Sequence, residues 1–200
     1  MLKPLPALAL VSLLTFAGAG MVFAGNSGAA PSLPGCHGGS ATGDACLLSL
    51  KNGHFDDRAL SSWERVGLPG HGTDAEGNTY AALPLGSSIQ QAVYAHTPQG
   101  SAEAVYTLRF QIRAEHAPAQ VRATLSMSTG QRTDLIPLGH VTSMALTDQW
   151  STVELSVQGR PYAAPAHVLV AIDNEGGTLA TVQVDDVVLI ESAGTEVFRR

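Results

Sequence analysis

The stretch Ala104-Val105-Tyr106-Thr107-Leu108-Arg109-Phe110-Gln111-Ile112-Arg113 is the clearest indication of the fold class of this chain. Its even-numbered residues are all apolar, whereas its odd-numbered residues are mostly polar or charged. A period of two places alternate side chains on opposite faces of a β-strand. The stretch therefore predicts a strand with one buried face and one face toward solvent.

The same period recurs further along the chain, at residues 121–128, 152–157 and 168–172. Less regular strands are expected in five other segments, residues 47–51, 78–85, 88–95, 135–146 and 181–190. Turn-forming Gly, Pro, Asn and Asp residues separate these segments, and no stretch after residue 24 carries a helical stripe of apolar residues. Short strands with turn signals between them predict an all-β fold, an antiparallel β-sandwich.

Residues 1–24 have the features of a secretory signal peptide. Lys3 precedes an apolar run from Leu5 to Phe23, and Val22-Phe23-Ala24 offers small residues at the two positions that signal peptidase reads. An uncleaved membrane anchor is the alternative, because the run approaches the roughly 20 residues that span a bilayer. The small residues around Ala24 favour cleavage, which predicts a secreted or periplasmic protein without a membrane span.

The amino-acid composition divides the rest of the chain into a linker, one domain and a C-terminal tail. Residues 25–44 are dominated by Gly, Ser, Ala and Pro, and they contain too little apolar surface to offset the entropy of ordering. They are expected to form a flexible linker. Residues 45–192 are close to the usual size of one domain, and residues 193–200 are expected to form a C-terminal tail.

The chain has two cysteines, Cys36 and Cys46. In an exported protein an even count indicates a disulfide, and the intervening Gly38-Gly39-Ser40 is flexible enough to let the sulfur atoms meet. Two free thiols in a tail are the alternative. A zinc site is less favoured, since His37 would supply only a third ligand.

The charge of the chain restricts the classes of partner that it can bind. The 11 Lys and Arg residues and 17 Asp and Glu residues give a formal net charge of −6, which becomes −7 when residues 1–24, and with them Lys3, are removed. Such a surface repels phosphate backbones, and the basic residues form no cluster. The composition therefore argues against nucleic acid as a partner and offers no basic patch for a membrane surface.

Five motifs follow one another between residues 47 and 190: Asn52-Gly53-His54-Phe55-Asp56 with Trp63, Gln91-Ala92-Val93, Tyr106–Ala114, Trp150-Ser151-Thr152-Val153 and Asp185–Leu189. In this order they resemble the CenC-type family of carbohydrate-binding modules, which are jelly rolls of the galactose-binding-domain-like kind. The resemblance implies a jelly-roll sandwich that binds an oligo- or polysaccharide.

The resemblance also implies a structural calcium ion held by the opening turn and the last strand. Asp185 shares parity with the apolar Val187 and Leu189, so in a regular strand its carboxylate points inward, where it needs a cation or several donors. Asp56, Asn78 and Asp185 are the candidate metal residues, and nearby carbonyl groups would supply further oxygens toward the six to eight that calcium takes. A carboxylate capped by backbone N–H groups is the alternative.

Aromatic residues are the usual platform for a sugar ring. Trp63 and Trp150 match family positions that fill the core, so we favour burial over ligand contact for both. Tyr80 and Tyr106 are interpreted in the same way. The aromatics left for an exposed platform are then Tyr94 and Tyr162.

A polar cleft is the candidate ligand site. Gln111 and Arg113 lie on the outward face of the first strand described above and can make paired hydrogen bonds to hydroxyl or carboxylate groups. Many family members carry an aromatic residue where Gln111 stands, so stacking is in doubt. With Gln91 and Tyr94 these two residues form the predicted ligand-binding set, and a solvated strand face is the alternative.

Three functions are compatible with these residues. The leading interpretation is a secreted, non-catalytic module that binds a glycan. The second is a structural or adhesive protein of the envelope or matrix, in which the same sandwich contacts another protein. A small hydrolase ranks last, because the sequence shows no connected arrangement of nucleophile and base.

Overall fold

A computed structural model of the protein describes residues 33, 35–36, 45–57, 59–96, 103–128, 135–147, 149–160, 166–176 and 179–194. The chain divides into two units, Met1–Ser32 and Leu33–Arg200, and all of the described residues belong to the second. The predicted signal peptide, most of the predicted linker, the end of the tail and Tyr162 lie outside the described residues. Nowhere in the described ranges is there a helix with the length and apolarity needed to cross a bilayer.

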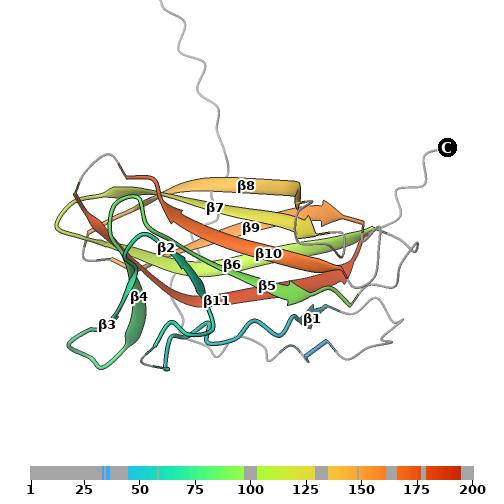
Figure 1. Ribbon diagram of the computed structural model, residues 1–200, viewed down its shortest axis with the longest axis horizontal. Coiled ribbons are helices and arrows are strands. Elements are labelled where there is room, and N and C mark those ends of the chain that lie inside the picture. The colour runs from blue at the N-terminus through green and yellow to red at the C-terminus, as the bar shows by residue number, and fades with distance from the viewer. Residues whose placement is uncertain are drawn as a thin grey trace, which may run out of the picture. The chain divides into compact units, whose positions relative to one another are not determined.

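The described residues form eleven strands, and the prediction of an all-β antiparallel sandwich is confirmed (Figure 1). The six-stranded sheet contains β3 (Gly70–Thr73), β4 (Thr79–Leu83), β11 (Thr181–Ala193), β6 (Ala104–Glu115) and β9 (Ser151–Gly159) in that order, with β1 (Cys46–Leu47) also paired to β11. The five-stranded sheet has the order β2 (Glu64–Val66), β5 (Ser88–Tyr94), β10 (His167–Asn174), β7 (Ala119–Ser128) and β8 (Leu135–Ala145).

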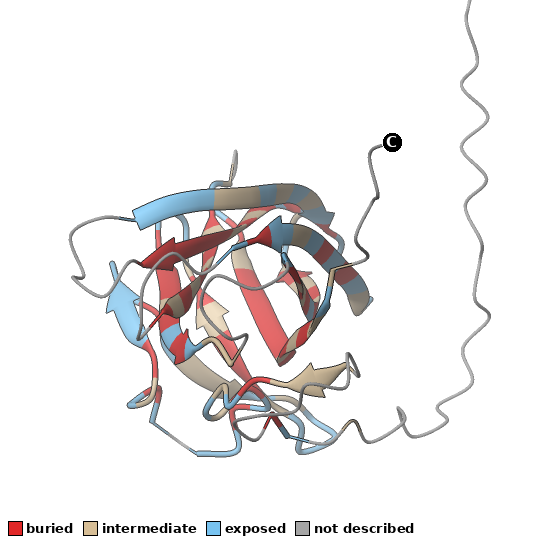
Figure 2. Ribbon diagram, turned by 90° about the vertical axis from the view of Figure 1, so that its right-hand side faces the viewer, coloured by how far each residue is buried: buried red, intermediate tan, exposed pale blue. Residues whose placement is uncertain are grey.

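The core lies between the two sheets and is built from the apolar phase of each strand (Figure 2). In β6 the buried residues are the even-numbered ones, from Ala104 to Ala114, as the alternation predicts. The facing sheet contributes the corresponding phase of β5, β7 and β10, including Ile89, Leu125 and Val170. Burial of one continuous apolar layer is the main driving force for closing the two sheets.

Two strands were not predicted, β2 and β3. All three residues of β2 are exposed, and β3 reads Gly-His-Gly-Thr, so neither has an apolar alternation to detect. Both lie at sheet edges, where only one side of the strand is paired. The predicted strand at residues 47–51 is shorter than expected, because only Cys46–Leu47 keep strand pairing with β11.

The first and last segments of the sandwich meet, as the motif order predicts. The Leu48 N–H donates to the Leu189 carbonyl (2.9 Å), and the Val187 N–H donates to the Gly53 carbonyl (2.9 Å). A Cβ atom on Gly53 would lie 2.1 Å from the Val187 carbonyl oxygen, so only glycine permits this approach. Gly53 of the opening motif therefore has a structural role.

The predicted disulfide is present between Cys36 and Cys46. Cys36 is buried and packs on the hydrophobic core, and Gly35 makes a bridge to Leu47. The N-terminal side of the disulfide is thus attached to the sandwich, within the segment that composition assigned to the linker.

The edge strands of the two sheets approach each other at β8 and β9. A Cβ atom on Gly139 in β8 would lie 2.7 Å from Cγ1 of Val157 in β9. Gly159 in β9 is similarly close to the side chain of Leu138 in β8. These two contacts, each between a glycine and an aliphatic side chain, close one long side of the sandwich.

Candidate functional site

The four predicted ligand residues do not form one cleft. Gln91 has the same parity in β5 as the core residues Ile89 and Val93, and it is buried. Its side-chain amide donates to the carbonyls of Lys51 (3.0 Å) and Ser62 (2.9 Å), and its oxygen accepts the Lys51 N–H (2.6 Å). Gln91 therefore ties the opening segment to β5, and its polar atoms are used within the protein.

Gln111 and Arg113 lie on the outer face of the six-stranded sheet, whereas Tyr94 lies on the outer face of the other sheet. Arg113 is fully engaged: its Nε donates to Gln183 (2.7 Å), it pairs with Asp74 (3.6 Å) and its guanidinium lies 4.6 Å from the Trp150 ring centroid. The prediction was right about the outward face of Gln111 and Arg113 and wrong about Gln91, and a single sequence could not show that β5 and β6 belong to different sheets.

The predicted orientation of Asp185 is wrong, because β11 contains a bulge. Asp185 pairs with Gln111, and the register with β6 shifts before Val188. Asp186, within the bulge, has a positive φ of 51°. The extra residue reverses the phase of the strand, so Val184 and Val187 both face the core while Asp185 lies on the outer side.

Asp185 is nevertheless buried under the turn before β4. One carboxylate oxygen accepts the Asp186 N–H (2.7 Å), and the other accepts the side-chain N–H of Asn78 (2.8 Å). Burial raises the pKa of Asp185 above its ordinary value of 3.8, while the two hydrogen bonds act in the opposite direction.

Asp186 extends this arrangement to the opening turn. Its carboxylate accepts the Gln111 amide (2.6 Å) and lies 2.7 Å from His54 Nδ1. Asp56 is further away in this network, where it accepts a hydrogen bond from the Thr79 hydroxyl (3.4 Å). We call the set of His54, Asn78, Gln111, Asp185 and Asp186 the bulge network.

In the bulge network the Asp185 carboxylate is capped by one backbone N–H, that of Asp186, and by the side-chain amide of Asn78. Each oxygen of Asp185 and Asp186 already has a nitrogen partner, and the described residues contain no group of three or more His, Cys, Asp or Glu side chains placed to hold a metal. A calcium ion takes six to eight oxygen atoms, so it does not fit these contacts as they stand. Binding of calcium by Asp56, Asn78 and Asp185 stays a prediction.

The aromatic residues occupy three environments. Trp63 is buried, 5.7 Å from the Phe55 ring, and its indole N–H donates to Asn52, as predicted for a core residue. Trp150 differs from the prediction, since it is only partly buried and packs between Arg113 and Tyr80 on the outer side of the six-stranded sheet. Tyr94 is 61% exposed and is the one exposed residue among the described tyrosines and tryptophans.

Tyr94 belongs to a cavity on the outer face of the five-stranded sheet. Its ring lies 4.2 Å from the imidazole of His167, its partner in the register of β5 and β10. The cavity measures about 480 Å³, and its other lining side chains mix polar and small apolar groups: Glu64, Gln90, Ala92, Ser128, Leu135 and Leu169. We call it the tyrosine pocket.

A second cavity, of about 390 Å³, lies on the same face toward the other end of β10. Its side chains are polar or charged, chiefly Arg122, Thr124, Asp173 and Glu175. Arg122 pairs with Glu175 (3.1 Å), but its Nε is buried without a hydrogen-bond partner. Burial raises the pKa of Asp173, Glu175 adds to this increase, and Ser88 and Arg122 act against it. We call this cavity the arginine pocket.

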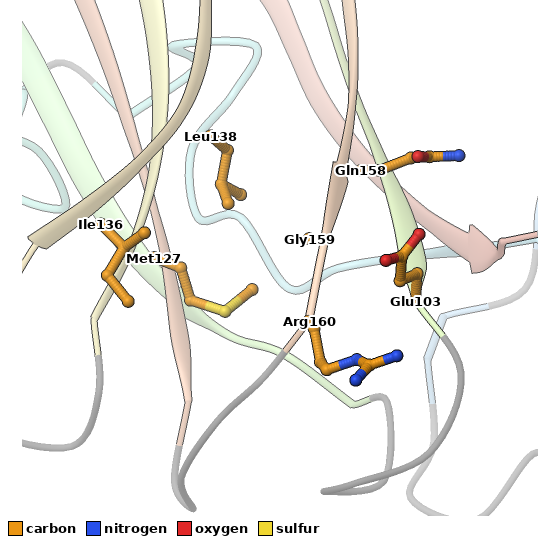
Figure 3. Close-up of a pocket in the computed structure, with 7 residues that line it drawn as sticks. All are labelled: Glu103, Met127, Ile136, Leu138, Gln158, Gly159 and Arg160. Atoms are coloured by element: carbon orange, nitrogen blue, oxygen red, sulfur yellow. The ribbon is translucent and has the colours of Figure 1, made fainter.

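A third cavity, of about 310 Å³, lies where β7 and β9 end and β6 and β8 begin (Figure 3). Met127, Ile136 and Leu138 gather on one side of the view, and Glu103, Gln158 and Arg160 lie on the other. The cavity is small for a ligand site and near the lower limit of about 300 Å³.

Sequence reasoning missed His167, Leu169, Asp173 and Arg122 as residues of one face. The sequence did contain a signal, because all four residues alternate with the buried residues of their strands. Their strands were predicted, but their pairing was not, and it is the pairing of β10 with β5 and β7 that brings them together.

Comparison with known proteins supports the fold. No family model and no curated protein matches the chain. Among solved structures it is similar to a CBM4 carbohydrate-binding module (19% identity, TM-score 0.50, covering 73% of this chain and 100% of the other). It is also similar to the CBM22-1 xylan-binding domain of Paenibacillus barcinonensis Xyn10C (14% identity, TM-score 0.50, 76% and 97% coverage).

A cyclase from Fischerella sp. TAU has the same fold, with 15% identity, a TM-score of 0.55 and coverage of 76% of this chain and 99% of the other. Structural neighbours therefore include both carbohydrate-binding modules and an enzyme. At these identities the likeness shows the β-sandwich fold, and function must be argued from the sites.

Proposed function

We propose that this protein is a secreted, non-catalytic carbohydrate-binding module whose ligand lies in the tyrosine pocket. The observation that carries the proposal is the exposed Tyr94 ring, held against His167 at the edge of a cavity lined by amide, hydroxyl and carboxylate groups. An aromatic face offers apolar area to the C–H groups of a sugar, and the polar groups around it can pair with its hydroxyl groups.

Three other observations support the proposal. The fold is that of carbohydrate-binding modules such as those of CBM4 and CBM22. The order of the five sequence motifs favours the CenC-type family in particular. The Cys36–Cys46 disulfide is typical of proteins from oxidising compartments, which agrees with export.

Replacing Tyr94 with alanine tests the site. The purified protein is passed over a panel of immobilised neutral polysaccharides, including xylan and β-glucans, and retention is measured with soluble polysaccharide as competitor. We expect saturable retention on at least one polysaccharide and a loss of affinity of about fivefold in Tyr94→Ala, since stacking contributes on the order of 1 kcal/mol.

Leu179→Ala is the matched control, because Leu179 is 92% exposed and lies outside the tyrosine pocket. It should bind as the unmodified protein does. Release of reducing ends from the retained polysaccharide would contradict the non-catalytic role, and equal retention of the two variants would remove the tyrosine pocket from the proposal.

Calcium is a separate prediction that rests on the family resemblance and on the closeness of its three candidate residues. Asn78 contacts Asp185, and Thr79, the next residue after Asn78, contacts Asp56. If the ion is present, exhaustive chelation lowers the melting temperature, calcium restores it, and Asp185→Asn abolishes the response. An unchanged melting curve after chelation would leave the hydrogen-bonded network as the complete description.

The second candidate function, contact with an envelope or matrix protein, is favoured by one surface feature. Val66, Leu68 and Leu85 are exposed aliphatic residues on or beside two turns that a hydrogen bond from the Leu68 N–H to the Ser87 hydroxyl connects (3.1 Å). Exposed apolar residues that lie together often mark a protein interface. Retention of an envelope protein without any sugar, lost when these leucines are replaced by serine, would support this candidate.

A further inference from the structure

The cavity at the end of the sandwich has one apolar wall and one polar wall (Figure 3). Met127, Ile136 and Leu138 line one side, and the side chains of Glu103 and Arg160 lie on the other. Its volume of about 310 Å³ suits a ligand smaller than a drug-sized molecule. We call it the end cavity. None of its described residues lines the tyrosine pocket or the arginine pocket, so it is a separate site.

The register of β6 and β9 places Glu103 and Arg160 beside each other. The last pair of these strands is Ala104 with Gly159, and Glu103 and Arg160 are the next residues beyond it. The Gly194 N–H donates to the Glu103 carbonyl (2.7 Å), which ties the backbone of Glu103 to the end of β11. Opposite residues on antiparallel strands have Cβ atoms about 5 Å apart, so their side chains can contact two groups on one carbon atom of a ligand.

Both charges of the polar wall are available to a ligand. Glu103 and Arg160 are exposed, and neither side chain has an ion-pair or hydrogen-bond partner among the described residues. Arg113 and Arg122 differ in this respect, because each pairs with a carboxylate. Gln158 lines the same cavity and adds a neutral donor and acceptor.

The two opposite charges determine the charge that a ligand must carry. A lone carboxylate could pair with Arg160 but would meet the negative charge of Glu103, and a lone ammonium group would meet the reverse conflict. A molecule with both groups satisfies both side chains. An α-amino acid carries them on one carbon atom, and its side chain can extend to the apolar wall around Met127. We propose that the end cavity binds a free α-amino acid with an aliphatic or thioether side chain.

This proposal goes beyond glycan binding and does not depend on it. Titration of the purified protein with L-leucine tests it, and binding is followed by NMR through the methyl signals of Met127, Ile136 and Leu138. L-Leucinamide lacks the carboxylate, and N-acetyl-L-leucine lacks the ammonium group. We expect saturable shifts with L-leucine and an affinity lower by about tenfold or more for each analogue, because each loses one charge-assisted hydrogen bond.

Two variants separate the two charged contacts. Arg160→Met should bind L-leucine about tenfold more weakly and lose the preference for L-leucine over L-leucinamide. Glu103→Gln should lose the preference over N-acetyl-L-leucine. Arg109→Met and Glu154→Gln are the matched controls, because these exposed residues are opposite each other on the same two strands and lie outside the end cavity. Both controls should bind as the unmodified protein does.

Three results would overturn the proposal: no saturable shift with L-leucine up to its solubility limit, equal affinity for the three probes, or unchanged binding in Arg160→Met. Tighter binding of either analogue would identify the end of a peptide as the ligand, and this too would overturn the assignment to a free amino acid. Normal binding of L-leucine by Tyr94→Ala, together with normal polysaccharide retention by Arg160→Met, would support two separate sites.

Discussion

Asp185 shows how one inserted residue changes the environment of its neighbours. Because Asp186 adopts a left-handed conformation in the bulge, the carboxyl group of Asp185 faces outward and is buried beneath Asn78. The chain compensates for this burial with N–H donors rather than with a basic side chain in direct contact. The stability of the folded protein therefore depends on whether Asp185 is protonated.

We expect the stability of the protein to decrease as the pH rises above about 4. The pKa of Asp185 in the folded protein is raised above 3.8, the value it keeps when unfolded, so between the two values the folded state binds more protons. Protonation in that window favours folding, and the contribution disappears once the pH exceeds the folded pKa. The measurement is the free energy of unfolding in urea from pH 4 to pH 7, compared between the unmodified protein and Asp185→Asn, in which this part of the slope should be missing.

Asp57→Asn serves as the control, because Asp57 is an exposed acidic residue in the opening turn whose side chain makes none of the contacts of the bulge network. Its pH dependence should match that of the unmodified protein. Identical slopes for Asp185→Asn and the unmodified protein would show that Asp185 keeps its ordinary pKa after folding.

At the level of elements, nine of the eleven strands were predicted from the sequence, and β2 and β3 were not. β6 has an apolar residue at every second position from Ala104 to Ala114, so sequence period and burial agree along its whole length. β3 is half glycine and β2 has three exposed residues, so their strand conformation comes from pairing with β4 and β5 and leaves no local pattern. Pairing between strands that are distant in the sequence depends on the tertiary structure, so it cannot be predicted from the local sequence pattern.

The candidate site was predictable only in part for the same reason. Tyr94 was correctly assigned to an outward face, and the parity of Gln91 with Ile89 already indicated burial. Which strands lie beside β5 could not be read from a single sequence. His167 of the tyrosine pocket and Asp173 of the arginine pocket are placed by the β5–β10–β7 order of the sheet.

The attachment of the shortest strand can be tested through its disulfide. β1 contains two residues, and Cys46 is one of them, so covalent linkage to the buried Cys36 compensates for the small number of ladder hydrogen bonds. Replacing both cysteines with alanine should lower the free energy of unfolding by about 2–3 kcal/mol, because a closed loop restricts the unfolded chain. Denaturation in urea with and without a reducing agent provides the measurement.

The reducing agent should destabilise the unmodified protein by a similar amount and should leave the double alanine variant unchanged, since the sequence contains no other cysteine. A protein whose unfolding midpoint does not respond to reduction would show that pairing with β11 alone is sufficient to hold β1.

For the molecule as a whole, the two sheets are joined through the core and also along one side, where β8 and β9 approach. Gly139 permits this contact, because any larger side chain would overlap Val157. We expect Gly139→Ala to lower the free energy of unfolding by about 1–3 kcal/mol through overpacking. The double variant with Val157→Ala should be more stable than the sum of the two single changes predicts.

The four proteins form a double-mutant cycle measured by chemical denaturation, with a coupling energy of about 0.5 kcal/mol or more as the expected result. Strict additivity would show that the sheets do not touch at this pair of residues.

The pairing of the first strand with the last has a mechanical consequence. Cys46 is opposite Glu191 in an antiparallel register. A pulling force on the chain before β1 and after β11 therefore acts on neighbouring strand ends, and the paired residues separate one pair after another. Tension entering from the N-terminal side passes through the disulfide to Cys46 and bypasses residues 37–45. A chain pulled at both ends would therefore begin to yield where β1 pairs with β11, while the five-stranded sheet remains outside the line of force.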